Sequence, residues 1–176
     1  MKFSEEEYER LLVENQERIY RLALRIIGNR EEALDVTQET LAAAYQQREK
    51  FRGEAKISTY LYRIGLNYAF ASLKKRKRLH LPIDSIGERP GNLDSPAQAL
   101  AKKERARRME LLLDGLPARQ KAAVHLRIYD DLPFAEVARI MGCQPATART
   151  LFFFGLKNLR RIIKEKDPVG VLFKQS

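Results

Sequence analysis

Aromatic and basic side chains are interleaved between residues 60 and 78 in a pattern that suits nucleic acid. The segment carries Tyr60, Tyr62, Asn67 and Tyr68, and it ends in five consecutive basic residues, 74–78. Aromatic rings stack on bases that have left a duplex, and cations pair with backbone phosphates. We therefore predict single-strand binding here, although a run of charge taken alone is more often just a solvated surface.

A second pattern, between residues 134 and 151, is typical of a helix-turn-helix. Two helices that cross steeply need a small residue at their contact, and Ala138 stands at that position. Gly142 suits the turn because glycine adopts a left-handed backbone without steric penalty. The apolar residues expected between the two helices are Val137, Met141, Ala148 and Leu151. The alternative is that both helices merely pack within a bundle.

In a helix-turn-helix the second helix enters the major groove, and residues near its start reach the base edges. The polar residues there are Thr147, Arg149 and Thr150, and Lys157 lies further along for phosphate. Cys143 falls in the turn and is expected to face inward as a small hydrophobe, with a redox-sensing role as the alternative.

A third group, Asp35, Gln38 and Glu39, shares one helical face at spacings of three and four residues. Taken alone, this group is an ordinary solvated polar face.

The sequence offers no pattern for catalysis or for a bound metal. It contains one cysteine and two histidines, which cannot assemble the usual zinc ligand sets. No nucleophile–base pairing and no glycine-rich phosphate loop is present. We predict that the protein is not an enzyme and has no cofactor.

Helices must position all three groups. Ser4 and Glu7 form a predicted capping box for a first helix that ends at Gly28, and Asn29 caps a second. The apolar stripe of that second helix is predicted to be Ala33, Leu34, Leu41, Ala44 and Tyr45. A loop over residues 51–55 precedes a third helix, which Ser58 is predicted to cap and which runs into the basic residues.

Prolines then divide the chain. Pro82, Pro90 and Pro96 fall close together, and so many prolines cannot share one helix. After this linker, helices are predicted from Ser95 to near Gly115, from Pro117, from Pro133 to Gly142, and from Gln144-Pro145 onward. We predict an all-α fold of two small helical domains, 1–80 and 96–166, with a Pro/Gly-rich linker 81–95 and a tail 167–176. Their arrangement in the free protein stays open.

Overall composition agrees with a nucleic-acid partner. The 176 residues carry a formal net charge of +10, with a pI near 9.8. Such charge favours a polyanionic partner, although a merely soluble basic protein would look the same. The first residues lack the apolar stretch of a signal peptide, and no apolar run reaches the roughly 20 residues of a membrane span, so we expect a cytoplasmic protein.

From about Tyr8 to Ile163 the chain resembles the extracytoplasmic-function (ECF) group of bacterial RNA polymerase sigma factors. Residues 35–41, Asp-Val-Thr-Gln-Glu-Thr-Leu, resemble the group's core-polymerase-binding motif. Residues 51–78 are similar to its segment for promoter melting and the minus-ten element. Residues 116–120, Leu-Pro-Ala-Arg-Gln, resemble the start of the second globular domain, whose helix-turn-helix reads the minus-thirty-five element.

The resemblance implies a role for each group of residues. Three residues would contact core polymerase: Asp35, Gln38 and Glu39. The minus-ten element would be contacted by residues of the loop and helix that follow, namely Arg52, Lys56, Ser58, Tyr60, Tyr62, Asn67, Tyr68, Lys74, Lys75, Arg76, Lys77 and Arg78. The minus-thirty-five element would be contacted by residues of the second domain, namely Arg119, Thr147, Arg149, Thr150 and Lys157. The implied partners are core RNA polymerase and promoter DNA. Because many members are held inactive by an anti-sigma factor, such a protein is a further implied partner.

The chain departs from the group's pattern within the recognition helix. Leu151 and Phe154 stand where many relatives have basic residues, which implies fewer phosphate contacts and a different upstream sequence. Phe152, Phe153 and Phe154 cannot all face one core, because successive helical residues point about 100° apart. We expect Phe152 in the core and at least one of the three exposed, with a polymerase or anti-sigma contact as a hypothesis for Phe153 or Phe154.

One alternative function is a helix-turn-helix regulator that binds DNA without polymerase. It accounts for the second domain but leaves the first without a role. Such a regulator binds duplex DNA tightly by itself, often at a palindromic site. A sigma factor binds promoters weakly alone and specifically as holoenzyme.

Overall fold

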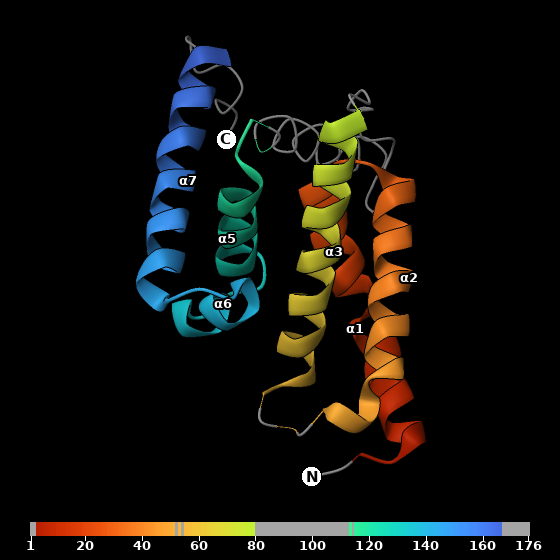
Figure 1. Cartoon of the computed structure of the whole chain (residues 1–176). Coiled ribbons are helices and arrows are strands. Elements are labelled where there is room, and N and C mark those ends of the chain that lie inside the picture. The colour runs from red at the N-terminus through yellow and green to blue at the C-terminus, as the bar shows by residue number, and fades with distance from the viewer. Residues whose placement is uncertain (1–2, 52, 54, 80–112, 114, 167–176) are drawn as a thin grey trace, which may run out of the picture.

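The computed structural model is all-helical over the residues it describes, which are 3–51, 53, 55–79, 113 and 115–166 (Figure 1). Its elements are α1 (Glu5–Ile27), α2 (Arg30–Gln46), the short 3-10 helix η1 (Arg48–Lys50), α3 (Ile57–Leu79), α5 (Ala118–Ile128), α6 (Phe134–Met141) and α7 (Pro145–Lys166). The predicted linker 81–95, most of the helix predicted from Ser95 and the tail 167–176 lie outside the described residues.

Capping defines the first two helices as predicted. The Ser4 hydroxyl accepts from the Glu7 backbone at 3.1 Å, and the Glu7 carboxylate accepts from the Ser4 backbone at 2.9 Å. Gly28 ends α1 with φ +76°, and the Asn29 side chain accepts from the Glu32 backbone at the start of α2. Local side-chain bonds therefore set both helix starts.

The first three helices form a bundle, seen at the right of Figure 1. Gly65 of α3 allows a close approach, because a Cβ there would lie 3.3 Å from Ile19 and 3.4 Å from Thr40. Thr37 and Thr40 are the buried polar residues of α2, and their hydroxyls donate to backbone carbonyls four residues earlier. The prediction that Leu34 belongs to the apolar stripe is wrong, since this side chain is 48% exposed.

The third helix begins two residues earlier than a cap at Ser58 predicts. α3 starts at Ile57, and the Tyr60 backbone donates to the Lys56 carbonyl at 3.1 Å. Ser58 therefore lies within the first turn of α3 and does not cap it.

The predicted helix-turn-helix is present as α6 and α7. Pro133 precedes α6, and Gly142 ends it with φ +61°, the left-handed conformation that the turn requires. Val137, Ala138, Met141 and Ala148 are buried between the helices, and Leu151 and Cys143 are half-buried against them. Gly155 brings α7 close to α5, since a Cβ there would lie 2.7 Å from the Val124 side chain.

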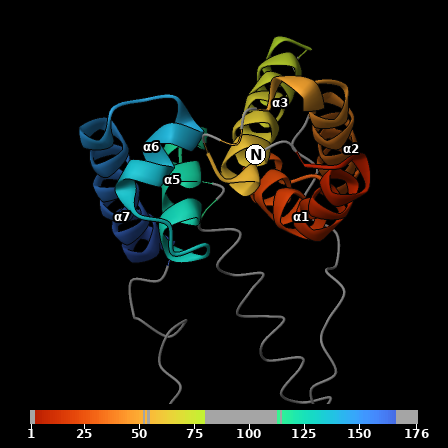
Figure 2. The ribbon, with the colours of Figure 1, turned by 90° about the horizontal axis from the view of Figure 1, so that it is seen from below.

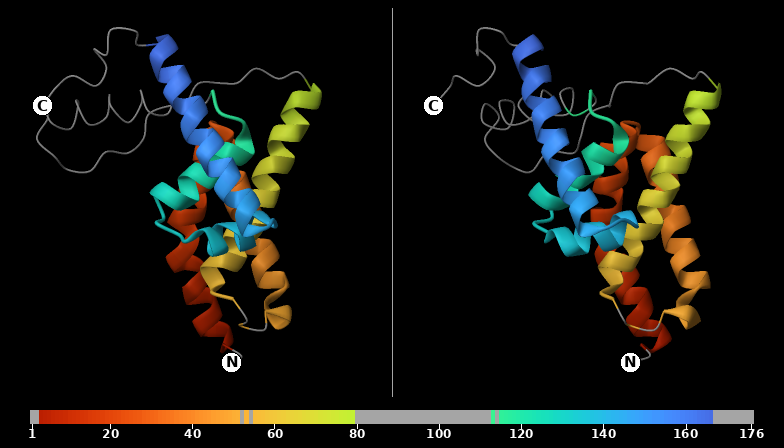
Figure 3. Two further views of the ribbon diagram at one scale, coloured as in Figure 1. Left: turned by 90° about the vertical axis from the view of Figure 1, so that its left-hand side faces the viewer. Right: turned by 60° about the vertical axis from the view of Figure 1, so that its left-hand side comes forward.

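The two helical clusters pack against each other, which the sequence left open. α6 contacts α3 and α5 contacts α1, and the view from below shows both clusters side by side (Figure 2). One hydrophobic core includes Leu22, Tyr62 and Leu66 from the first cluster together with Leu126 and Val137 from the second. The side views in Figure 3 show α7 crossing in front of this packing, with α3 behind it.

Candidate polymerase and nucleic-acid interface

An open groove of about 410 Å³ runs between α2 and α3, and residues from two different predicted sites line it. Asp35 and Glu39 form part of the α2 wall, and Tyr68 and Lys75 form part of the α3 wall. Gln38 is exposed on the same helix, as predicted for a docking face. The structure thus joins the predicted polymerase face to part of the predicted minus-ten segment.

Arg76 corrects the prediction for the basic run. Its side chain is 7% exposed, and its guanidinium is bound to the Glu32 carboxylate and donates to the Ile27 carbonyl at 3.2 Å. Arg76 therefore holds α3 against the junction of α1 and α2 and does not face phosphate. Lys74, Lys75, Lys77 and Arg78 are exposed, so phosphate binding stays a prediction for these four.

Glu32 is the acidic centre of this contact, and sequence reasoning missed it. The Ser72 hydroxyl donates to Glu32 Oε2 at 2.6 Å, and Arg76 Nε donates to Oε1 at 3.1 Å. Partial burial acts to raise the pKa of Glu32, but these hydrogen bonds and the charges of Arg76 and Lys75 outweigh it and lower the pKa. Glu32 is therefore held as an anion inside the fold.

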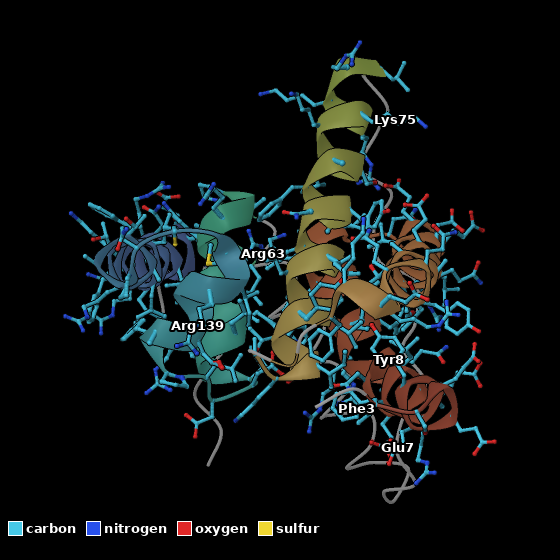
Figure 4. All side chains as sticks on the ribbon, turned by 60° about the horizontal axis from the view of Figure 1, so that its bottom comes forward. Phe3, Glu7, Tyr8, Arg63, Lys75 and Arg139 are labelled. Atoms are coloured by element: carbon cyan, nitrogen blue, oxygen red, sulfur yellow. The ribbon has the colours of Figure 1, made fainter. Side chains whose placement is uncertain are left out.

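A row of aromatic rings lies where α3 begins. Phe51 lies 5.2 Å from Tyr60, 6.1 Å from Phe3 and 6.2 Å from Tyr8, measured between ring centroids. Burial, followed by the nearby Tyr60, raises the pKa of Tyr8 to about 12. Figure 4 shows Phe3 and Tyr8 together at this end of the bundle, far from Lys75. The signal for Phe3 was present in the sequence, since an apolar residue just before a cap commonly packs near the first turn.

Most of the other minus-ten candidates are exposed or half-buried. Lys56 and Asn67 are exposed, and Ser58, Tyr60 and Tyr68 are half-buried. Arg52 lies outside the described residues.

Tyr62 is buried, with 4% exposure, and its position corrects the prediction that it holds a DNA strand in this arrangement. Burial first, and then the negative charge of Asp130, raise the pKa of Tyr62. Asp130 belongs to the second cluster and lies 3.3 Å from His125 Nε2. Tyr62 thus faces the other domain.

The predicted upstream-element residues lie on the surface of the second cluster. Arg119 on α5 and Thr147, Arg149, Thr150 and Lys157 on α7 are all exposed. The Thr150 hydroxyl donates to the Ala146 carbonyl at 2.9 Å, so its free capacity is as an acceptor. Phe152 is half-buried while Phe153 and Phe154 are 57% and 52% exposed, which confirms that the three phenylalanines do not share one core.

Two family descriptions match this chain, one to each cluster. Sigma-70 region 2 matches residues 11–79, and sigma-70 region 4 matches residues 106–159. The ECF RNA polymerase sigma-E factor of Haemophilus influenzae is 31% identical over 134 residues, which cover 71% of each chain. This chain belongs to the ECF group of the sigma-70 family. The helix-turn-helix lies within its region 4, and the groove lies within its region 2.

Other relatives agree over nearly the whole length. RNA polymerase sigma factor SigV of Bacillus subtilis is 28% identical over 158 residues, covering 89% of this chain and 90% of that protein. The sigma factor RpoE of Bartonella quintana, solved in complex with the anti-sigma factor NepR, shares the fold with a TM-score of 0.73 and 20% identity. That match covers 89% of this chain and 96% of the other.

Family membership decides between the functions that the sequence allowed. The protein is a sigma factor of transcription initiation, with a DNA-binding helix-turn-helix, and it is not an enzyme. Among the described residues, no group of three or more potential ligands could hold a metal ion. No helix in the described part of the chain is long and apolar enough to cross a membrane.

Proposed function

We propose that this sigma factor docks on core RNA polymerase through the α2 face that carries Asp35, Gln38 and Glu39. All three side chains are exposed, and the adjacent Leu34 is 48% exposed on the same helix. An apolar residue beside exposed acids suits a partner helix that carries both apolar and basic residues. This exposed α2 face above the groove is the observation that carries the proposal.

Region 2, which we assign to residues 1–80, binds the opened minus-ten element. Lys56, Ser58 and Tyr60 stand at the start of α3, and Asn67 and Tyr68 stand about two to three turns further on. Extruding a base costs a few kcal/mol, and contacts of this kind offset that cost. The exposed cations Lys74, Lys75, Lys77 and Arg78 add a salt-sensitive attraction for phosphate.

Region 4, which we assign to residues 96–166, reads the minus-thirty-five element. The support is geometric, because Thr147, Arg149 and Thr150 are exposed on the first turns of α7. This is the part of a recognition helix that reaches base edges in the major groove. Arg119 and Lys157 are also exposed and would contact the same upstream element, Lys157 through backbone phosphate.

The protein acts in the cytoplasm and is held inactive by an anti-sigma factor until a signal releases it. Support for such a partner comes from the related RpoE fold, which was solved with an anti-sigma factor bound. The exposed rings of Phe153 and Phe154 are candidate contacts. If Phe153→Ala and Phe154→Ala leave the affinities for polymerase and for the anti-sigma factor unchanged, these rings have no such role.

The deciding experiment is run-off transcription from a promoter library with bacterial core polymerase. We expect initiation that depends on this protein and falls strongly in the variant Asp35→Ala/Gln38→Ala/Glu39→Ala. A matched control removes two exposed acids and one exposed glutamine from α1, namely Glu14, Gln16 and Glu17. Equal activity of the two triple variants would place the docking face elsewhere. Tight duplex binding by the protein alone, with no initiation, would instead support an independent regulator.

A further inference from the structure

The ring of Phe134 lies beside two guanidinium groups of the helix-turn-helix. Its centroid is 5.5 Å from Arg149 Cζ on α7 and 5.6 Å from Arg127 Cζ at the end of α5. Both distances fall within the range of a cation–π contact. The Phe134 ring is half-buried and packs against Phe152. The two rings meet edge-on, with their centroids 5.4 Å apart.

The two arginines differ in their other partners. Arg127 Nη1 is 2.7 Å from the Asp131 carboxylate, so its charge is already paired within the fold. Arg149 makes no ion pair with any described residue, and its side chain is exposed about one turn from the start of α7. Phe134 is therefore the contact that restricts Arg149, which would otherwise sample many rotamers.

We propose that Phe134 is a positioning residue that orients Arg149 for reading the upstream promoter element. The proposal rests on the function proposed above for α7. A guanidinium reads guanine through two parallel hydrogen bonds, which require a defined direction of the planar group. A flat aromatic surface beside Arg149 orders that plane before DNA arrives and lowers the cost of ordering it on binding.

A purely structural role for Phe134 predicts something different. If the ring only fills space against Phe152, a leucine of similar apolar character would serve almost as well, and any loss would affect all promoters equally. A positioning role requires the loss to be confined to the base pairs that Arg149 reads. A measurement of base discrimination therefore distinguishes the two roles, whereas a measurement of stability alone does not.

The test measures holoenzyme binding to a promoter selected from the library and to versions with single base-pair changes in the upstream element. Phe134→Leu is expected to lower discrimination at the positions read by Arg149 by about two- to fivefold, the range of an exposed cation–π contact. Phe134→Tyr should retain it. The control is Ile128→Ala, which alters an apolar side chain at the end of α5 that is 53% exposed and should leave discrimination unchanged.

The Arg149→Ala background decides the mechanism. We expect Phe134→Leu to have no further effect on discrimination once Arg149 is absent, because the two residues act through one contact. An equal loss in both backgrounds, or no loss in either, would overturn the positioning role while the function of α7 stands. If Arg149→Ala itself leaves discrimination unchanged, the proposed base reading by Arg149 fails, and the role of Phe134 fails with it.

Discussion

The hydroxyl oxygen of Thr59 on α3 lies 3.3 Å from a carboxylate oxygen of Glu136 on α6, and this contact joins the two sigma domains directly. A second link joins the two domains through α1, where Arg25 Cζ is 3.7 Å from the centre of the Tyr129 ring. The buried Tyr62 adds apolar area between the domains. The domain contact therefore combines a shared core with specific polar links.

Weakening these links should open the molecule. We expect Tyr129→Ala/Glu136→Ala to raise the radius of gyration measured by small-angle scattering, because the cation–π contact contributes about 0.5–2 kcal/mol. The control Phe153→Ala/Glu165→Ala changes two exposed residues of α7 and should leave the radius unchanged. A radius identical in all three proteins would show that the shared apolar core alone holds the domains together.

Promoter binding should separate the domains further. The minus-ten and minus-thirty-five elements, which regions 2 and 4 are proposed to bind, are named for positions about 25 base pairs apart. This spacing corresponds to about 85 Å along B-DNA. Two domains in contact cannot reach both elements at once. Fluorescent labels on exposed positions of α2 and α7 should therefore show lower energy transfer in the promoter-bound holoenzyme than in the free protein. Unchanged transfer would contradict simultaneous reading of both elements.

Arg76 should matter for stability and Lys77 should not, although both belong to the same basic run. Arg76→Ala leaves Glu32 partly buried without its main partner, and we expect a loss of about 1–3 kcal/mol in the free energy of unfolding. Lys77→Ala changes an exposed side chain and should stay within about 0.5 kcal/mol. Urea unfolding of the two variants gives the comparison, and equal stabilities would refute the anchoring role of Arg76.

The same contact predicts a dependence of stability on pH. Because the pKa of Glu32 is lowered in the folded state, its stabilising effect is present above its unfolded pKa, about 4.3, and is lost as pH falls through the folded pKa. Glu32→Gln should be less stable than the natural protein at neutral pH, and the difference should shrink under acid. A difference that stays constant from pH 7 to pH 3 would exclude this linkage.

Gly142 should tolerate asparagine better than alanine. Its φ of +61° lies in the left-handed region, where a Cβ costs roughly 1–2 kcal/mol and where asparagine is accepted more readily than most residues. The space around a Cβ is open at this position, so backbone strain alone sets the cost. Thermal unfolding should rank the natural protein above Gly142→Asn and Gly142→Ala last.

Local features were predictable because they depend on neighbours in the chain. The capping box at Ser4, the glycine end of α1 and the Pro133–Gly142 limits of α6 all follow from bonds between residues a few positions apart. Predictions that needed a neighbour from another helix were less accurate. Leu34 was assigned to the core by helical periodicity, but Thr37 and Thr40 occupy the buried face of α2.

The sequence by itself determined the helices, the helix-turn-helix and the membership of the sigma family, because periodicity, caps and motif order are written along the chain. Only the tertiary structure decided which side chains of the basic run and of the aromatic group face solvent and which are buried. Arg76 turns inward because Glu32 and the Ile27 carbonyl meet it there, and Tyr62 is buried because the second domain covers it. Such roles depend on partners at distant sequence positions, which packing in three dimensions alone brings together.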